Sequence, residues 1–119
     1  MIRIQRVYDA PTQGAGKSFL VERLWPRGVR KEALRLDDWL KETAPSTELR
    51  RWFAHDPAKW PEFQRRYRQE LKANPAAWQP LLAAARRGIV TLLYSARDTE
   101  HNSALVLKVF LEKRMSTDR

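Results

Sequence analysis

The feature that most constrains this chain is the apolar segment Ile89–Tyr94, which directly follows Gly88. A short run of this kind, apolar at neighbouring positions, is typical of a strand buried on both faces. A second apolar segment, Ala104–Leu111, follows within ten residues and leaves little polar face, so we expect a helix over about Thr99–Lys113. A buried strand with a helix to cover it predicts an α/β domain.

Two further strands are expected near the N-terminus. Ile2–Tyr8 and Phe19–Trp25 are rich in β-branched and aromatic residues, and the glycine-rich segment Gln13–Lys17 between them is typical of a loop. Residues 26–36 are charged and begin with Pro26, so we expect them to be irregular.

Three helices are expected in the middle of the chain, because each has a side chain that can cap its first turn. Two of these caps directly precede a proline, which suits the first position of a helix. The caps and their helices are Ser46 with Thr47–Ala54, Asp56 with residues 57–73, and Asn74 with residues 75–88. The order β-β-α-α-α-β-α predicts a single domain over residues 1–119, with a sheet of about three strands packed by four to five helices. Residues 113–119 are expected to form a frayed tail.

Composition limits the classes of function. Lys and Arg number 23 against 14 Asp and Glu, and the net charge of +9 favours anionic partners. Five tryptophans argue against a disordered basic tail. No apolar run could span a membrane, and the N-terminus lacks the apolar core of a secretory signal, so we expect a cytoplasmic protein with no membrane partner.

Two classes of site are disfavoured by residue type. The chain has no cysteine, which excludes a thiolate nucleophile, an iron–sulfur site and a disulfide. The two histidines, His55 and His101, lack the spacing of metal ligands, so we expect no metal site and no cofactor.

The segment Gly14–Ser18 has the sequence Gly-Ala-Gly-Lys-Ser, like the end of a phosphate-binding P-loop. The full pattern needs a glycine where this chain has Pro11, and it needs a helix directly afterwards. The residues after Ser18 are strand-like and soon reach Pro26. A loop between strands is therefore the better interpretation.

Ligands of α/β sheets bind beyond the carboxyl ends of the strands, which selects two segments of this chain. Residues 23–31 hold three arginines and a lysine around Gly28, and a planar guanidinium suits phosphate or carboxylate. The alternative is that these cations pair with the acidic residues of 36–49. The second segment, Tyr94–Asn102, carries a hydroxyl, carboxylates and an imidazole at the start of a helix, although Asp98 could simply cap that helix.

The first hypothesis is a small domain with an anion-binding cleft at the strand ends, with catalysis left open. His101 and Asp98 are the acid–base candidates, since a histidine pKa of roughly 6.5 suits proton transfer near neutral pH. Arg23→Ala is then expected to abolish binding of a phosphate-bearing ligand without unfolding the protein. The candidate ligand-binding residues are Arg23, Arg27 and Arg50 for the anion, Trp25 and Tyr94 as apolar walls, and His55, Ser95 and Asn102.

The second hypothesis is a nucleic-acid-binding module, and the third is a regulatory subunit that binds another protein without chemistry. Within 57–73, one aromatic stripe is expected to face the core, with a solvated basic side opposite and an Arg66–Glu70 pair beside it. Nucleic acid could lie along that basic side, although no sequence-reading motif is present. The residues that would contact it are Arg30, Lys31, Arg65, Arg68 and Lys72.

A set of spaced motifs over about residues 1–113 resembles one family. The motifs are Arg23–Gly28, Trp39, Ala44–Ser46, Leu49–Arg50, Trp52–Phe53, His55–Pro57, Trp60, Phe63, Arg66–Tyr67, Glu70–Leu71 and Thr91–Asn102. Together they resemble the YeaO-like proteins of the domain-of-unknown-function 488 family. The resemblance implies a small prokaryotic, cytoplasmic α/β protein without an established activity.

The resemblance also points to particular polar positions. They are Arg23, Arg27, Arg50, His55, Asp56, Arg66, Glu70, Ser95, Asp98, His101 and Asn102. Larger relatives carry a Cys-His-Arg segment near the place where this chain has His101-Asn102-Ser103. Chemistry that needs that cysteine and arginine is therefore not implied for this chain.

Overall fold

The computed structural model describes residues 1–9 and 16–117. A parallel sheet forms its centre, with four strands in the order β1-β4-β2-β3. The α/β class is confirmed, and β2 ends at Leu20 rather than at Trp25. Most of the expected loop Gln13–Lys17 lies outside the described residues, and Lys17 belongs to β2. The strands are β1 (Ile2–Arg6), β2 (Lys17–Leu20), β3 (Asp38–Trp39) and β4 (Val90–Tyr94).

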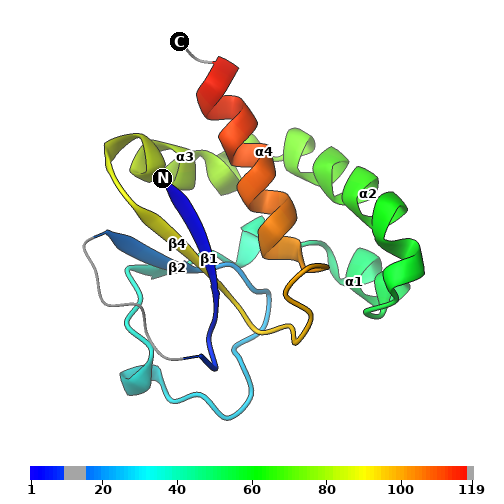
Figure 1. Ribbon diagram of the computed structural model, residues 1–119, viewed down its shortest axis with the longest axis horizontal. Coiled ribbons are helices and arrows are strands. Elements are labelled where there is room, and N and C mark those ends of the chain that lie inside the picture. Colours follow the sequence, from blue (N-terminus) through cyan, green and yellow to red (C-terminus); the bar gives the residue numbers. More distant parts are fainter. Residues whose placement is uncertain (10–15, 118–119) are drawn as a thin grey trace.

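The α-helices gather at one side of the molecule, with the sheet at the other (Figure 1). Two of the expected caps are confirmed, because Ser46 accepts a hydrogen bond from the N–H of Leu49 and Asp56 accepts one from Ala58. The helices are α1 (Thr47–Phe53), α2 (Trp60–Ala73), α3 (Pro75–Arg87) and α4 (Ser103–Thr117). Three short 3₁₀ turns are η1 (Lys31–Ala33), η2 (Lys41–Thr43) and η3 (Pro57–Lys59).

Three expectations about helix ends are wrong. The Asn74 side chain makes no capping hydrogen bond, although α3 does begin directly after it. The last helix begins at Ser103 instead of Thr99, because the Asp98 carboxylate accepts hydrogen bonds from the N–H groups of the next residues and holds them in a turn. That helix also continues to Thr117 instead of ending near Lys113, and residues 118–119 of the expected tail lie outside the described residues.

The core lies between the helices and one face of the sheet. All five residues of β4 are buried, which confirms the prediction for that strand. α4 packs on β1 and β4, and α2 packs on α4. Phe63, Tyr67 and Leu71 of α2 are buried, as expected for a core-facing stripe. The expected pairing of Arg66 is wrong, since its guanidinium bonds to Glu62 on the preceding turn instead of Glu70.

No helix in the described part of the chain is both long and apolar enough to cross a membrane.

Candidate functional site

A cleft of about 110 Å³ lies beyond the carboxyl ends of β2 and β4, bordered by α1 and by the start of α4. We call it the strand-end cleft. Phe53 and Phe63 contribute apolar surface to it. Its polar lining residues are Glu22, Arg50, His55, Ser95, His101, Asn102 and Ser103.

The structure brings together five of the residues singled out in the sequence. Arg50, His55, Ser95, His101 and Asn102 all line the strand-end cleft, although 52 positions separate the first from the last in the chain. Arg50 and His55 come from α1 and the turn after it, and the other three from the segment between β4 and α4. The parallel arrangement of β2 and β4 places the chain that follows β2 beside the segment that follows β4.

Glu22 is a cleft residue that the sequence reasoning missed. Its Oε1 accepts hydrogen bonds from the backbone N–H of Ser95 at 2.7 Å and from the Ser95 hydroxyl at 2.9 Å. The Ser95 hydroxyl is therefore held by a carboxylate and not by a histidine. A polar residue directly after the apolar run Phe19–Val21 was the available signal, because it stands at the carboxyl end of a strand.

His101 is oriented by Asp98. The His101 Nδ1 lies 2.8 Å from the Asp98 Oδ2, and the His101 ring meets the Trp60 ring edge-on at 5.2 Å between centroids. The hydrogen bond from the Glu100 N–H, helped by those from His101, lowers the pKa of Asp98 below its ordinary value. Asp98 is thus a carboxylate at neutral pH and positions the imidazole.

Hydrogen-bond donors without a partner in the described part of the chain occur at Arg50 and at the start of α4. The guanidinium of Arg50 makes no hydrogen bond or ion pair with any residue in the described ranges. At the start of α4, the Asn102 Oδ1 accepts from the N–H of Leu105 at 2.9 Å. The N–H groups of Ser103 and Ala104 have no acceptor among the described residues, and the first turn of α4 holds no acidic residue. A helix start of this kind attracts negative charge.

His55 is held by the way α1 ends. Ala54 and His55 both adopt left-handed backbone conformations, with φ of 48° and 57°. These two residues turn the chain sharply, and the His55 ring then lies against the ring of Phe53 at 6.3 Å between centroids. Asp56 caps the next turn, η3, as expected.

Arg23, the first residue expected to bind an anion, has its guanidinium bound to other groups of the protein. Its guanidinium donates to the backbone carbonyls of Ala44 at 3.0 Å and Pro45 at 3.2 Å, and it lies 3.7 Å from a carboxylate oxygen of Glu42. For Arg23, this is the alternative described above, in which a cation of residues 23–31 pairs with the acidic segment 36–49. Arg23 therefore braces residues 42–45 against the end of β2.

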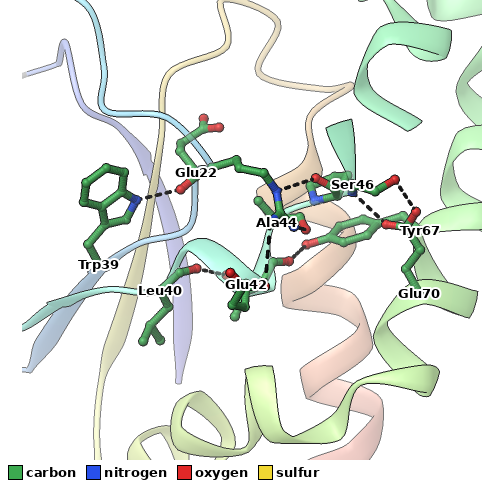
Figure 2. A network of polar contacts seen from close by, with 11 residues as sticks. Glu22, Trp39, Leu40, Glu42, Ala44, Ser46, Tyr67 and Glu70 are labelled. Carbon is green, nitrogen blue, oxygen red and sulfur yellow. Dashed lines mark hydrogen bonds and ion pairs between the residues drawn. The ribbon is translucent and has the colours of Figure 1, made fainter. Parts of the chain in front are cut away.

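The same segment is fixed from its other side by α2 (Figure 2). The Tyr67 hydroxyl donates to the Thr43 carbonyl, and the Ser46 N–H and hydroxyl donate to Glu70 at 2.8 Å and 2.6 Å. Burial raises the pKa of Tyr67. This network holds Pro45, which forms part of the wall of the strand-end cleft.

Trp25, Arg27 and Tyr94 do not line the strand-end cleft. The indole N–H of Trp25 donates to the Val29 carbonyl at 2.6 Å. Arg27 is exposed, and Tyr94 is buried among core residues, where burial raises its pKa.

The basic residues considered for nucleic acid form two separate groups. Arg30 and Lys31 lie in the exposed loop after β2, whereas the others lie on α2 at the opposite side of the molecule (Figure 1). Arg65 pairs with Glu62 at 2.7 Å, and the hydrogen bonds from Arg65 and Arg66 lower the pKa of Glu62 to about 2. Arg68 is partly buried and Lys72 is exposed.

Within residues 1–9 and 16–117, no cluster of His, Asp and Glu could hold a metal ion.

Comparison with known proteins identifies the family. The chain is 44% identical over 110 residues to the uncharacterised protein YeaO of Escherichia coli, covering 92% of this chain and 96% of that protein. It is 38% identical over 113 residues to the uncharacterised protein Rv3073c of Mycobacterium tuberculosis, covering 95% of each. No solved structure matches it. The family described as the inactive DUF488-N3 subclade matches residues 1–119, and the chain therefore belongs to that subclade, DUF488-N3i.

Proposed function

We propose that the chain binds a small anionic molecule in the strand-end cleft and performs no reaction on it. The main support is the guanidinium of Arg50, which lines the cleft and has no partner within the described residues. A guanidinium binds carboxylate or phosphate through two parallel hydrogen bonds. The N–H of Ser103, the first residue of α4 and a lining residue of the cleft, also has no acceptor among the described residues and adds a second donor.

The size and the charges of the cleft limit the ligand. Its volume of about 110 Å³ is below the roughly 300–1,000 Å³ of ordinary small-molecule pockets, so it suits one anionic group with a few further atoms. Glu22 lies in the same cleft and supplies an acceptor. A molecule with a carboxylate or phosphate can bind Arg50 through that group, and a neighbouring hydroxyl or amino group can donate to Glu22.

Binding without catalysis is favoured by the chemistry of the polar residues. The family is described as inactive. Ser95 donates to the Glu22 carboxylate, which is a weaker base than imidazole, so the pair lacks the arrangement of an activated serine. The family resemblance implies a Cys-His-Arg segment in larger relatives near His101-Asn102-Ser103, where this chain has neither the cysteine nor the arginine.

The test is a binding titration of the full chain followed by amide NMR, with lactate, serine, acetate and inorganic phosphate as the compounds added. Arg50→Gln is the test variant. Arg51→Gln is the control, because Arg51 is exposed on the same helix and does not line the cleft. Loss of a charge-assisted pair is expected to weaken binding by at least about tenfold in Arg50→Gln and not in Arg51→Gln.

The amides of Ser95, His101 and Ser103 are expected to shift on binding, because these residues line the strand-end cleft. Lactate and serine are expected to bind more tightly than acetate, which lacks the neighbouring donor for Glu22. The proposal fails if none of the four compounds moves these amides, or if Arg50→Gln binds as tightly as the wild type.

A further inference from the structure

A second, larger groove lies on the face of the sheet that the core helices leave uncovered. Its volume is about 760 Å³, and its lining residues come from β1, β2, β4 and neighbouring loops, with none from an α-helix. Sheets whose strands are all parallel are normally covered by helices on both faces. We call this the open-face groove, and it shares no lining residue with the strand-end cleft.

Polar side chains form a row across this face. Arg3 of β1 is in register with Thr91 of β4, and Thr91 is in register with Ser18 of β2, so the three residues project from the same face of the sheet. Adjacent strands lie about 4.8 Å apart, so Thr91 is a direct neighbour of both Arg3 and Ser18. Thr91 and Ser18 line the open-face groove.

Three side-chain donors of this row have no hydrogen-bond partner among the described residues. The Nε of Arg3 is buried and has no hydrogen-bond partner there. The side-chain hydroxyls of Thr91 and Ser18 likewise make no hydrogen bond with a described residue. Buried polar groups are nearly always paired, and the centre of a parallel sheet is ordinarily apolar. The hydroxyls of Thr91 and Ser18 line the groove and can donate to a bound acceptor, whereas Arg3 lies in the same row but is not a lining residue.

Three arginines and two aspartates lie at the open-face groove, namely Arg3 of the row and the lining residues Arg6, Arg35, Asp9 and Asp37. Arg35 lines the groove, is exposed, and has no ion-pair partner within the described residues. Both acidic lining residues are already engaged, since Asp9 pairs with Arg6 at 3.2 Å and Asp37 accepts from the Ser18 N–H at 2.8 Å. Asp37 keeps its negative charge, and the charged donor that has no partner within the described residues is the guanidinium of Arg35.

We infer that the open-face groove binds a phosphate monoester of mononucleotide size. Guanidinium groups and hydroxyls are suitable donors to phosphate oxygens. Leu34, Leu36 and Leu93 supply apolar surface for the body of the molecule. The volume of the open-face groove, about 760 Å³, lies in the range of ordinary ligand pockets. The volume of the strand-end cleft, about 110 Å³, lies below that range.

The test uses the full chain titrated with adenosine 5′-monophosphate, adenosine and inorganic phosphate. The monophosphate is expected to shift the amides of Ser18, Thr91 and Leu93, and to bind at least about tenfold more tightly than adenosine. Arg35→Gln is expected to weaken it by about tenfold or more, and this exposed substitution leaves the core intact. Arg51→Gln, at an exposed arginine outside the groove, is the matched control.

Thr91→Val removes a hydroxyl at nearly constant shape and is expected to weaken the monophosphate more than adenosine. The amides of Ser95 and His101 report binding in the strand-end cleft, so one titration separates the two sites. The inference is overturned if the three amides do not shift, if adenosine binds equally well, or if Arg35→Gln and Arg51→Gln weaken binding alike. It is also overturned if shifts occur only at Ser95 and His101.

Discussion

Two arginines near the strand ends show how far the surroundings decide a residue's role. Arg23 and Arg50 both suit an anion by residue type. The guanidinium of Arg23 donates hydrogen bonds to the carbonyls of Ala44 and Pro45, whereas that of Arg50 has no partner in the described part of the chain. The partners of Arg23 are backbone atoms, and their position depends on how residues 40–46 are folded. The residue types alone therefore could not separate the two.

The substitution Arg23→Ala is expected to lower the free energy of unfolding by about 2 kcal/mol, because two buried carbonyls lose a charged donor. Arg50→Ala is expected to change it by less than about 0.5 kcal/mol, since the side chain makes no bond in the folded chain. Urea unfolding of the two variants and the wild type measures both values. Equal destabilisation by the two substitutions would contradict the roles assigned to them.

At the scale of elements, the start of α4 illustrates what local sequence can and cannot decide. Asp98, Thr99, Asn102 and Ser103 are all residue types that cap helices, and they stand together before the apolar run. The structure uses Asp98 for the preceding turn and Asn102 for the cap. This choice places Asn102 and Ser103, at the start of α4, among the lining residues of the strand-end cleft.

Asn102→Ala is expected to lower the free energy of unfolding by about 1–2 kcal/mol, as the loss of a cap usually does. The side chain is also buried, and its amide donates to the Asp98 carbonyl at 3.1 Å. Thr99→Ala is expected to change stability by less than about 0.5 kcal/mol, because Thr99 is exposed and lies outside the helix. Urea unfolding measures both, and a larger effect at Thr99 would mean that the helix begins there in solution.

Elements with a strong local pattern were predictable from the sequence, and arrangements between distant segments were not. The buried strand β4 and the capped start of α1 each depend on a few neighbouring residues. The two-residue strand β3 has no pattern of its own and exists because it pairs with β2. In the strand-end cleft, the contact of Glu22 with Ser95 spans 73 positions, and only the strand order brings the two together.

At the scale of the whole molecule, Tyr67 ties the helical layer to the segment that follows β3. It is buried on α2, and its hydroxyl donates to the Thr43 carbonyl. Burial raises the pKa of Tyr67 above the value of about 10 that it has in the unfolded chain. A raised pKa in the folded state means that stability is fully present below pH 10 and is lost as the pH rises further.

Between its unfolded and folded pKa values, Tyr67 is expected to lower the free energy of unfolding by about 1.4 kcal/mol for each pH unit. Tyr67→Phe removes this ionisation, so its stability curve above pH 10 is expected to be shallower by that amount. The variant starts from a lower stability at pH 8, because the Thr43 carbonyl loses its donor. Urea unfolding of both proteins from pH 8 to about pH 11.5 measures the two slopes. All other ionisable groups are common to the two proteins, so the difference between the slopes isolates Tyr67. Parallel curves would show that the Tyr67 hydroxyl reaches water in the folded state.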